Sequence, residues 1–98
     1  MFVFEIFLPV VDTRGEYFPP EIFREAFDDL ADKFGFIETR TVYRPLHLDG
    51  ASIQERELCR YRFDVPSTEE NQRLLVTWRT NQERRFQESL WMIRYRST

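Results

Sequence analysis

The chain has 98 residues, close to the smallest length at which one hydrophobic core folds unaided, so we expect a single domain over residues 1–98 and exclude two-domain enzymes. Hydrophobic residues make up 42% and charged residues 32%, which is typical of a folded soluble protein and excludes a disordered chain. The net charge of −3 is unevenly spread, with eight acidic and three basic residues in 1–35 but nine acidic and eleven basic residues in 36–98. Of the 14 basic residues, 13 are arginine, a bias that favours ion pairs and stacking on rings.

The first half of the chain predicts a strand, a helix and a second strand. Residues 2–8 are aromatic and β-branched and stop at Pro9, which is typical of a strand. A helix is expected from about Pro20 to Phe34, because apolar residues recur there at spacings of three and four, and Gly35 suits its end. Residues 36–44 then alternate and are rich in Thr, Val and Tyr, which predicts the second strand.

The second half repeats this plan in the order strand, helix, strand. We expect a polar loop over 45–56 and a strand over 57–65 that Pro66 ends. Ser67 with Glu70 resembles a capping box and opens a helix over about 68–85, with Leu74, Leu75 and Trp78 facing inward. The apolar run in 89–95 predicts the last strand.

The order β-α-β-β-α-β predicts a ferredoxin-like α+β fold, in which two helices cover one face of a four-stranded antiparallel sheet. Alternation along the strands assigns side chains to the two faces. Those expected to meet the helices are Phe4, Ile6, Leu8, Ile37, Thr39, Thr41, Tyr43, Cys59, Tyr61, Phe63, Val65, Trp91, Ile93 and Tyr95. Those expected on the other face, here called the open face, are Val3, Glu5, Phe7, Glu38, Arg40, Val42, Arg44, Leu58, Arg60, Arg62, Asp64, Leu90, Met92 and Arg94.

The open face is the predicted site of association. Its apolar members Val3, Phe7, Leu58, Leu90 and Met92 together exceed what a monomer usually exposes, so we expect a cover. The simplest cover is a second copy of the same face, with Arg40, Arg60 and Arg62 paired to Glu5 and Glu38. The predicted partner-binding residues are Glu5, Phe7, Arg40, Arg60, Arg62, Met92 and Arg94.

Candidate catalytic groups are few, and we predict no catalytic residue, no metal site and no cofactor. His47 and Asp49 form a His-x-Asp pair in the predicted loop, but no recognised metal spacing or nucleophile accompanies them. Cys59 on a central strand is expected to be a buried apolar residue rather than a nucleophile. Glu5 beside Arg60 is interpreted as an ion pair rather than a general base.

The chain is expected to be a complete cytoplasmic protein. A single cysteine excludes an intramolecular disulfide, and the apolar start is interrupted by Glu5 and Pro9 and lacks the basic region of a signal peptide. No membrane span is predicted.

Scattered positions resemble a group of small uncharacterised bacterial proteins. They are Phe7-Leu8-Pro9, Asp12 with Gly15, Phe18-Pro19, Phe23, Phe34-Gly35 and Glu83-Arg-Arg-Phe-Gln87. The group has Gly-Leu-Trp after its second strand, whereas residues 45–50 here read Pro-Leu-His-Leu-Asp-Gly. The resemblance implies a ferredoxin-like fold and no activity.

Three functions remain open. The first is a non-catalytic module that binds itself, as a homodimer, or another protein through the open face. The second is a dimeric α/β-barrel enzyme or small-ligand binder with a pocket lined by Glu5, Phe7, Arg60 and Met92. The third is an RNA- or DNA-binding module using Arg60 and Arg62. It is disfavoured because no aromatic residue of residues 57–65 is predicted on the open face and the overall charge is acidic.

Overall fold

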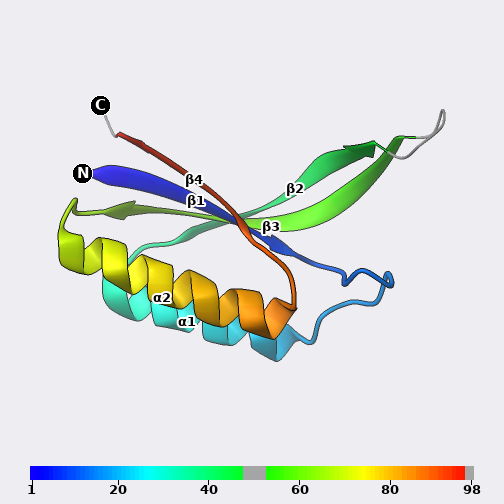
Figure 1. Cartoon of the computed structure of the whole chain (residues 1–98), viewed down its shortest axis with the longest axis horizontal. Coiled ribbons are helices and arrows are strands. Elements are labelled where there is room, and N and C mark those ends of the chain that lie inside the picture. Colours follow the sequence, from blue (N-terminus) through cyan, green and yellow to red (C-terminus); the bar gives the residue numbers. More distant parts are fainter. Residues whose placement is uncertain (48–52, 97–98) are drawn as a thin grey trace.

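The computed structural model describes residues 1–47 and 53–96. The elements follow in the order β1 (Phe2–Pro9), α1 (Pro20–Phe34), β2 (Glu38–His47), β3 (Ile53–Val65), α2 (Glu69–Phe86) and β4 (Trp91–Arg96). The strands form one antiparallel sheet in the order β2-β3-β1-β4, and both helices lie on the same side of it (Figure 1). The predicted ferredoxin-like α+β fold is therefore confirmed.

The β2–β3 hairpin is longer than predicted. Residues 45–47 and 53–56 belong to the strands, so the expected loop over 45–56 is wrong. Pro45 lies within β2, which is an edge strand, where a residue without an N–H group is tolerated. As a result the far half of the hairpin extends beyond the helices (Figure 1).

Local signals set the ends of the helices. Pro20 is the first residue of α1, and Gly35 ends it with φ 80° while its N–H donates to the carbonyl of Ala31 at 2.8 Å. The N-cap of α2 is Thr68 rather than the predicted Ser67, because the Thr68 hydroxyl accepts from the N–H of Asn71 at 3.1 Å. Within residues 1–47 and 53–96, no helix has both the length and the apolar character to cross a membrane.

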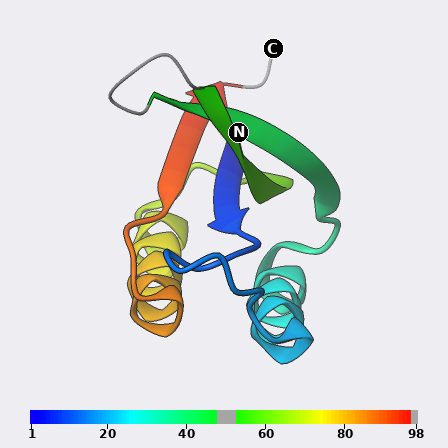
Figure 2. The ribbon, with the colours of Figure 1, turned by 90° about the vertical axis from the view of Figure 1, so that its right-hand side faces the viewer.

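The hydrophobic core lies between the sheet and the two helices, which run side by side beneath it (Figure 2). Side chains of β1, α1, β3 and α2 form it, together with one residue just ahead of β2 and one just ahead of β4: Phe4, Ile6, Leu8, Ala26, Leu30, Ile37, Tyr61, Phe63, Val65, Leu75, Trp78, Phe86 and Leu90. Two polar groups within it bind α1 carbonyls, since the Trp78 indole donates to Ala26 and the Tyr61 hydroxyl donates to Phe23, both at 3.2 Å. These bonds fix β3 and α2 against the same helix.

The predicted face assignment is right for β1 and β3 and wrong for β4. Met92 pairs with Ile6 and Arg94 pairs with Phe4, so Met92 and Arg94 lie on the helix side, whereas the sequence placed them on the open face. Leu90 enters the core ahead of the strand, where Glu83 accepts from its N–H at 2.8 Å and Arg79 donates to its carbonyl at 2.7 Å. This attachment fixes the register, and a shift of one residue moves every side chain of the strand to the other face.

Candidate interaction surface

The open face consists of rows of side chains that run across the strands in the order β2, β3, β1, β4. One row contains Glu38, Arg62, Glu5 and Ile93, and the next contains Arg40, Arg60, Phe7 and Trp91. Asp64, Val3 and Tyr95 precede them, and Val42, Leu58 and Pro9 follow. The structure thus brings together five of the predicted site residues, namely Glu5, Phe7, Arg40, Arg60 and Arg62. It leaves Met92 and Arg94 on the other side.

An ion-pair network occupies the centre of this face. Arg60 binds Glu5 at 3.3 Å and Glu38 at 3.4 Å, so one guanidinium serves carboxylates from both neighbouring strands. The Arg60 and Glu5 side chains are only 16% and 15% exposed, because the surrounding strands shield them. The predicted pairing of Arg60 with acidic groups therefore forms inside one chain and needs no second copy. Glu5 is engaged by Arg60, as the ion-pair interpretation expects.

A stack of three side chains closes the next part of the face. The rings of Phe7 and Trp91 stack with centroids 4.4 Å apart, and the guanidinium of Arg44 lies 4.5 Å from the Trp91 ring. Arg44 belongs to β2 and Trp91 to β4, at opposite edges of the sheet. Their contact shows that the sheet coils toward its open face, where it encloses a cavity of about 80 Å³ lined in part by Phe7, Leu58 and Trp91.

This coiling corrects the prediction of a large exposed apolar patch. Val3, Phe7 and Leu58 lie on the open face but are buried within the single chain. Leu90 and Met92 lie on the helix side and contribute to the main core. The apolar side chains from which a covering partner was predicted are therefore already buried or partly buried by other parts of the same chain.

Exposed aromatic side chains instead mark the two edges of the face. Trp91 is 44% and Tyr95 38% exposed on β4, and Phe36 is 83% exposed just before β2. Phe36 lines a hollow of about 360 Å³ together with Glu38, Arg62 and Asp64, at the β2–β3 end of the face. Sequence reasoning missed these three aromatic residues as site candidates, and a correct β4 register would have identified Trp91 and Tyr95.

Two exposed arginines between these edges, Arg40 and Arg62, have no acidic partner in the described part of the chain. Arg40 lies opposite Arg60, and Arg62 lies opposite Glu38 on one side and Glu5 on the other. Within residues 1–47 and 53–96, neither Arg40 nor Arg62 forms an ion pair, because Arg60 takes both Glu5 and Glu38. The open face therefore presents unpaired positive charge flanked by aromatic rings.

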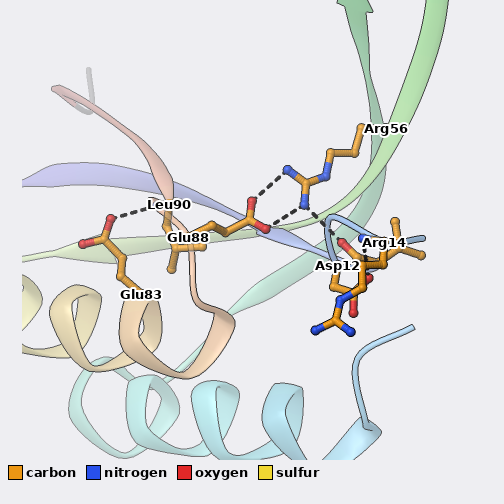
Figure 3. Close-up of polar contacts among 7 residues, drawn as sticks. Asp12, Arg14, Arg56, Glu83, Glu88 and Leu90 are labelled. Carbon is orange, nitrogen blue, oxygen red and sulfur yellow. Dashed lines mark hydrogen bonds and ion pairs between the residues drawn. The ribbon is translucent and has the colours of Figure 1, made fainter. Parts of the chain in front are cut away.

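A polar clamp supports the Trp91 end of the surface (Figure 3). Arg56 on β3 donates to both carboxylate oxygens of Glu88, at 2.7 and 2.8 Å, and to the carbonyl of Val11 at 3.1 Å. This bidentate pair ties the hairpin to the α2–β4 turn directly ahead of Trp91. Figure 3 also shows Glu83 binding Leu90, so both sides of the turn are held. Trp91 thus follows a turn that polar contacts hold on both sides.

The titratable groups of the helix side suit structural roles. Burial raises the pKa of the Cys59 thiol, and burial raises the pKa of the Tyr61 hydroxyl, an effect that Cys59 and Asp28 reinforce. In the part of the chain that the structure describes, no three His, Cys, Asp or Glu residues cluster as a metal site requires. His47 is the last residue of β2 rather than a loop residue, and Asp49 lies outside the described residues.

Comparisons with known proteins identify the fold and no family. No family model matches the chain, and no curated protein does. Among solved structures, a phage SAM lyase in complex with S-methyl-5′-thioadenosine superposes with a TM-score of 0.68 and covers 96% of this chain and 79% of its own. The two sequences are 8% identical, so the likeness supports the ferredoxin-like fold and assigns no residue a role.

Proposed function

We propose that this protein is an interaction module that associates with further copies of itself through the open face. The observation that carries the proposal is the composition of what remains exposed there: Trp91, Tyr95 and Phe36 around the unpaired arginines Arg40 and Arg62. Trp, Tyr and Arg are the residues that most often dominate the energy of protein–protein binding. The clamp at Arg56 adds the rigidity that such a surface needs.

Sedimentation velocity over a range of micromolar concentrations tests this proposal. We expect the sedimentation coefficient of the wild type to rise with concentration. Tyr95→Ala should weaken the association by about tenfold, because it removes an exposed aromatic contact. Val76→Ala on α2 is the matched control, since Val76 is equally an exposed apolar residue but lies away from the open face. A wild type that stays monomeric throughout would contradict the proposal.

A second candidate function is the binding of a small planar ligand at Trp91. The specific observation is the Phe7–Trp91–Arg44 stack. The planar guanidinium of Arg44 lies over the Trp91 ring, and a flat heterocycle would also stack on that ring. The phage SAM lyase of similar fold holds such a heterocycle in S-methyl-5′-thioadenosine, which makes that compound a reasoned first probe. This candidate is limited to binding and includes no reaction.

Tryptophan fluorescence distinguishes the second candidate from the first. S-methyl-5′-thioadenosine bound on Trp91 should quench its emission in the wild type and leave the emission of Trp91→Phe unchanged, because the other tryptophan, Trp78, is buried in the core. No quenching at millimolar compound would reject ligand binding at this position. Concentration-dependent sedimentation without quenching would leave self-association as the function.

A further inference from the structure

The open face and helix α1 carry net charges of opposite sign. The open face carries five arginines, Arg40, Arg44, Arg56, Arg60 and Arg62, against three acids, Glu5, Glu38 and Asp64, and Arg56 is also bound to Glu88 of the adjoining turn. Helix α1 carries five acids, Glu21, Glu25, Asp28, Asp29 and Asp32, against the two bases Arg24 and Lys33. The helix lies beneath the sheet (Figure 2), so its acidic surface points away from the open face of its own chain.

Most of the acidic groups of α1 form no ion pair with the residues that the structure describes. Glu25 binds Arg85 of α2 at 3.1 Å. Glu21, Asp28, Asp29 and Asp32 are all exposed and form no ion pair among residues 1–47 and 53–96. Their spacing places them on the outer face of the helix, opposite the side that packs on the core. Each copy therefore offers unpaired carboxylates on α1 and unpaired guanidiniums at Arg40 and Arg62.

We propose that the open face of one copy binds the outer face of α1 of a second copy. The inference rests on the self-association proposed above and names the surface that the open face contacts. The 15 residues of α1 extend over roughly 22 Å, while a four-stranded sheet measures about 15 Å across, so the helix can lie across the part of the open face that the contact of Arg44 with Trp91 does not close. Phe36 at one edge and Trp91 at the other then contact its flanks.

The alternative of two open faces in contact is disfavoured by charge. Each open face has a surplus of arginine, and its central carboxylates Glu5 and Glu38 are already bound to Arg60. A symmetric pairing sets two faces with this arginine surplus against each other, and like charges in contact are costly at an interface. The proposed contact joins two different surfaces and is therefore heterologous, so it builds a closed ring or an open chain of copies rather than a symmetric dimer.

Charge reversal on each surface tests the contact. Arg62→Glu on the open face and Asp32→Lys on α1 should each weaken association by about tenfold in sedimentation experiments. A mixture of the two variants should associate about as tightly as the wild type, because each reversed surface then finds an opposite one. Arg84→Glu and Glu70→Lys make the same charge changes on exposed positions of α2 and are the matched controls. Circular dichroism of every variant verifies that it is folded.

The outcomes separate this inference from the function on which it rests. A monomeric wild type would contradict both. A wild type that associates while Asp32→Lys leaves the association unchanged would overturn the contact with α1 and leave self-association standing. Failure of the mixture to restore binding would likewise overturn the pairing of these two surfaces. Association that disappears on nuclease treatment would show bridging by nucleic acid, which would contradict both.

Discussion

At the scale of single residues, Gln82 is a polar side chain buried among the apolar side chains of the core. Its side chain is 1% exposed on the inner face of α2, and neither of its amide atoms has a hydrogen-bond partner among the groups of the described residues. A buried polar group without a partner costs about 1–3 kcal/mol. Residue 82 follows Leu75 and Trp78 at helical spacing, so the fold places its side chain on the buried face of α2. Glutamine is a residue type more often found on the surface.

Replacing Gln82 with leucine should therefore stabilise the protein. We expect Gln82→Leu to raise the free energy of unfolding by about 1 kcal/mol, measured by urea denaturation. Gln72→Leu, an exposed change on the same helix, should shift it by less than about 0.5 kcal/mol. A lower stability of Gln82→Leu would show that the amide has a partner and contradict the assignment.

Loss of one partner of the central ion pair should be destabilising, because it leaves the other charge partly shielded by the sheet and uncompensated. Removing the charge of Glu5 leaves Arg60 with only the more distant and more exposed Glu38. We expect Glu5→Gln to lower the free energy of unfolding by about 1–2 kcal/mol, less than for a fully buried pair because both side chains retain some exposure. A double-mutant cycle with Arg60→Met should give a coupling energy showing that the Glu5 and Arg60 side chains stabilise each other. Zero coupling would contradict a stabilising pair.

Cys59 should react slowly in the native protein. Burial raises the pKa of its thiol, so the reactive thiolate is scarcer at any given pH than in a free cysteine. We expect iodoacetamide at mildly alkaline pH to modify the native protein far more slowly than the urea-unfolded chain, as mass spectrometry would show. Equal rates in both states would contradict the structural role assigned to this residue.

At the scale of elements, the end of α1 depends on one glycine. Gly35 has φ 80° and ψ −117°, a conformation that residues with a Cβ rarely adopt, although a Cβ there would meet no atom within 4 Å. The cost of a side chain is therefore conformational rather than steric contact with neighbours. We expect Gly35→Ala to lower the free energy of unfolding by about 1–3 kcal/mol. Lys33→Ala in the same last turn is the control, and an equal effect of both changes would contradict this account.

The last strand shows why a pattern can predict an element and still misplace its faces. Trp91, Met92 and Ile93 are apolar in succession, so alternation alone permits either face assignment. The decision comes from the Leu90 attachment to α2, since Glu83 and Arg79 hold the backbone of Leu90. Those contacts join residues of the helix to the start of the strand, and no periodicity within the strand reveals them.

At the scale of the whole molecule, coiling brings the two edges of the sheet into contact. Arg44 from one edge covers the ring of Trp91 at the other. Arg44→Ala should make Trp91 more accessible, so acrylamide quenching of fluorescence should increase in this variant. The increase should be absent when Trp91→Phe is combined with Arg44→Ala, because the remaining Trp78 is in the core. Unchanged quenching in the single variant would contradict the stacked arrangement.

The sequence by itself determined the order of the elements and the inward faces of β1, β3 and α1, because those features follow from local periodicity and from Pro and Gly at the ends. It also identified Glu5, Phe7, Arg40, Arg60 and Arg62 as members of one face. Only the tertiary structure decided the face of β4, the length of the hairpin and the burial of Phe7 and Leu58. These depend on contacts between residues far apart in the chain, such as Arg44 with Trp91 and Arg56 with Glu88. The tertiary structure thus replaced an expected apolar patch with a surface of arginines and exposed aromatic rings.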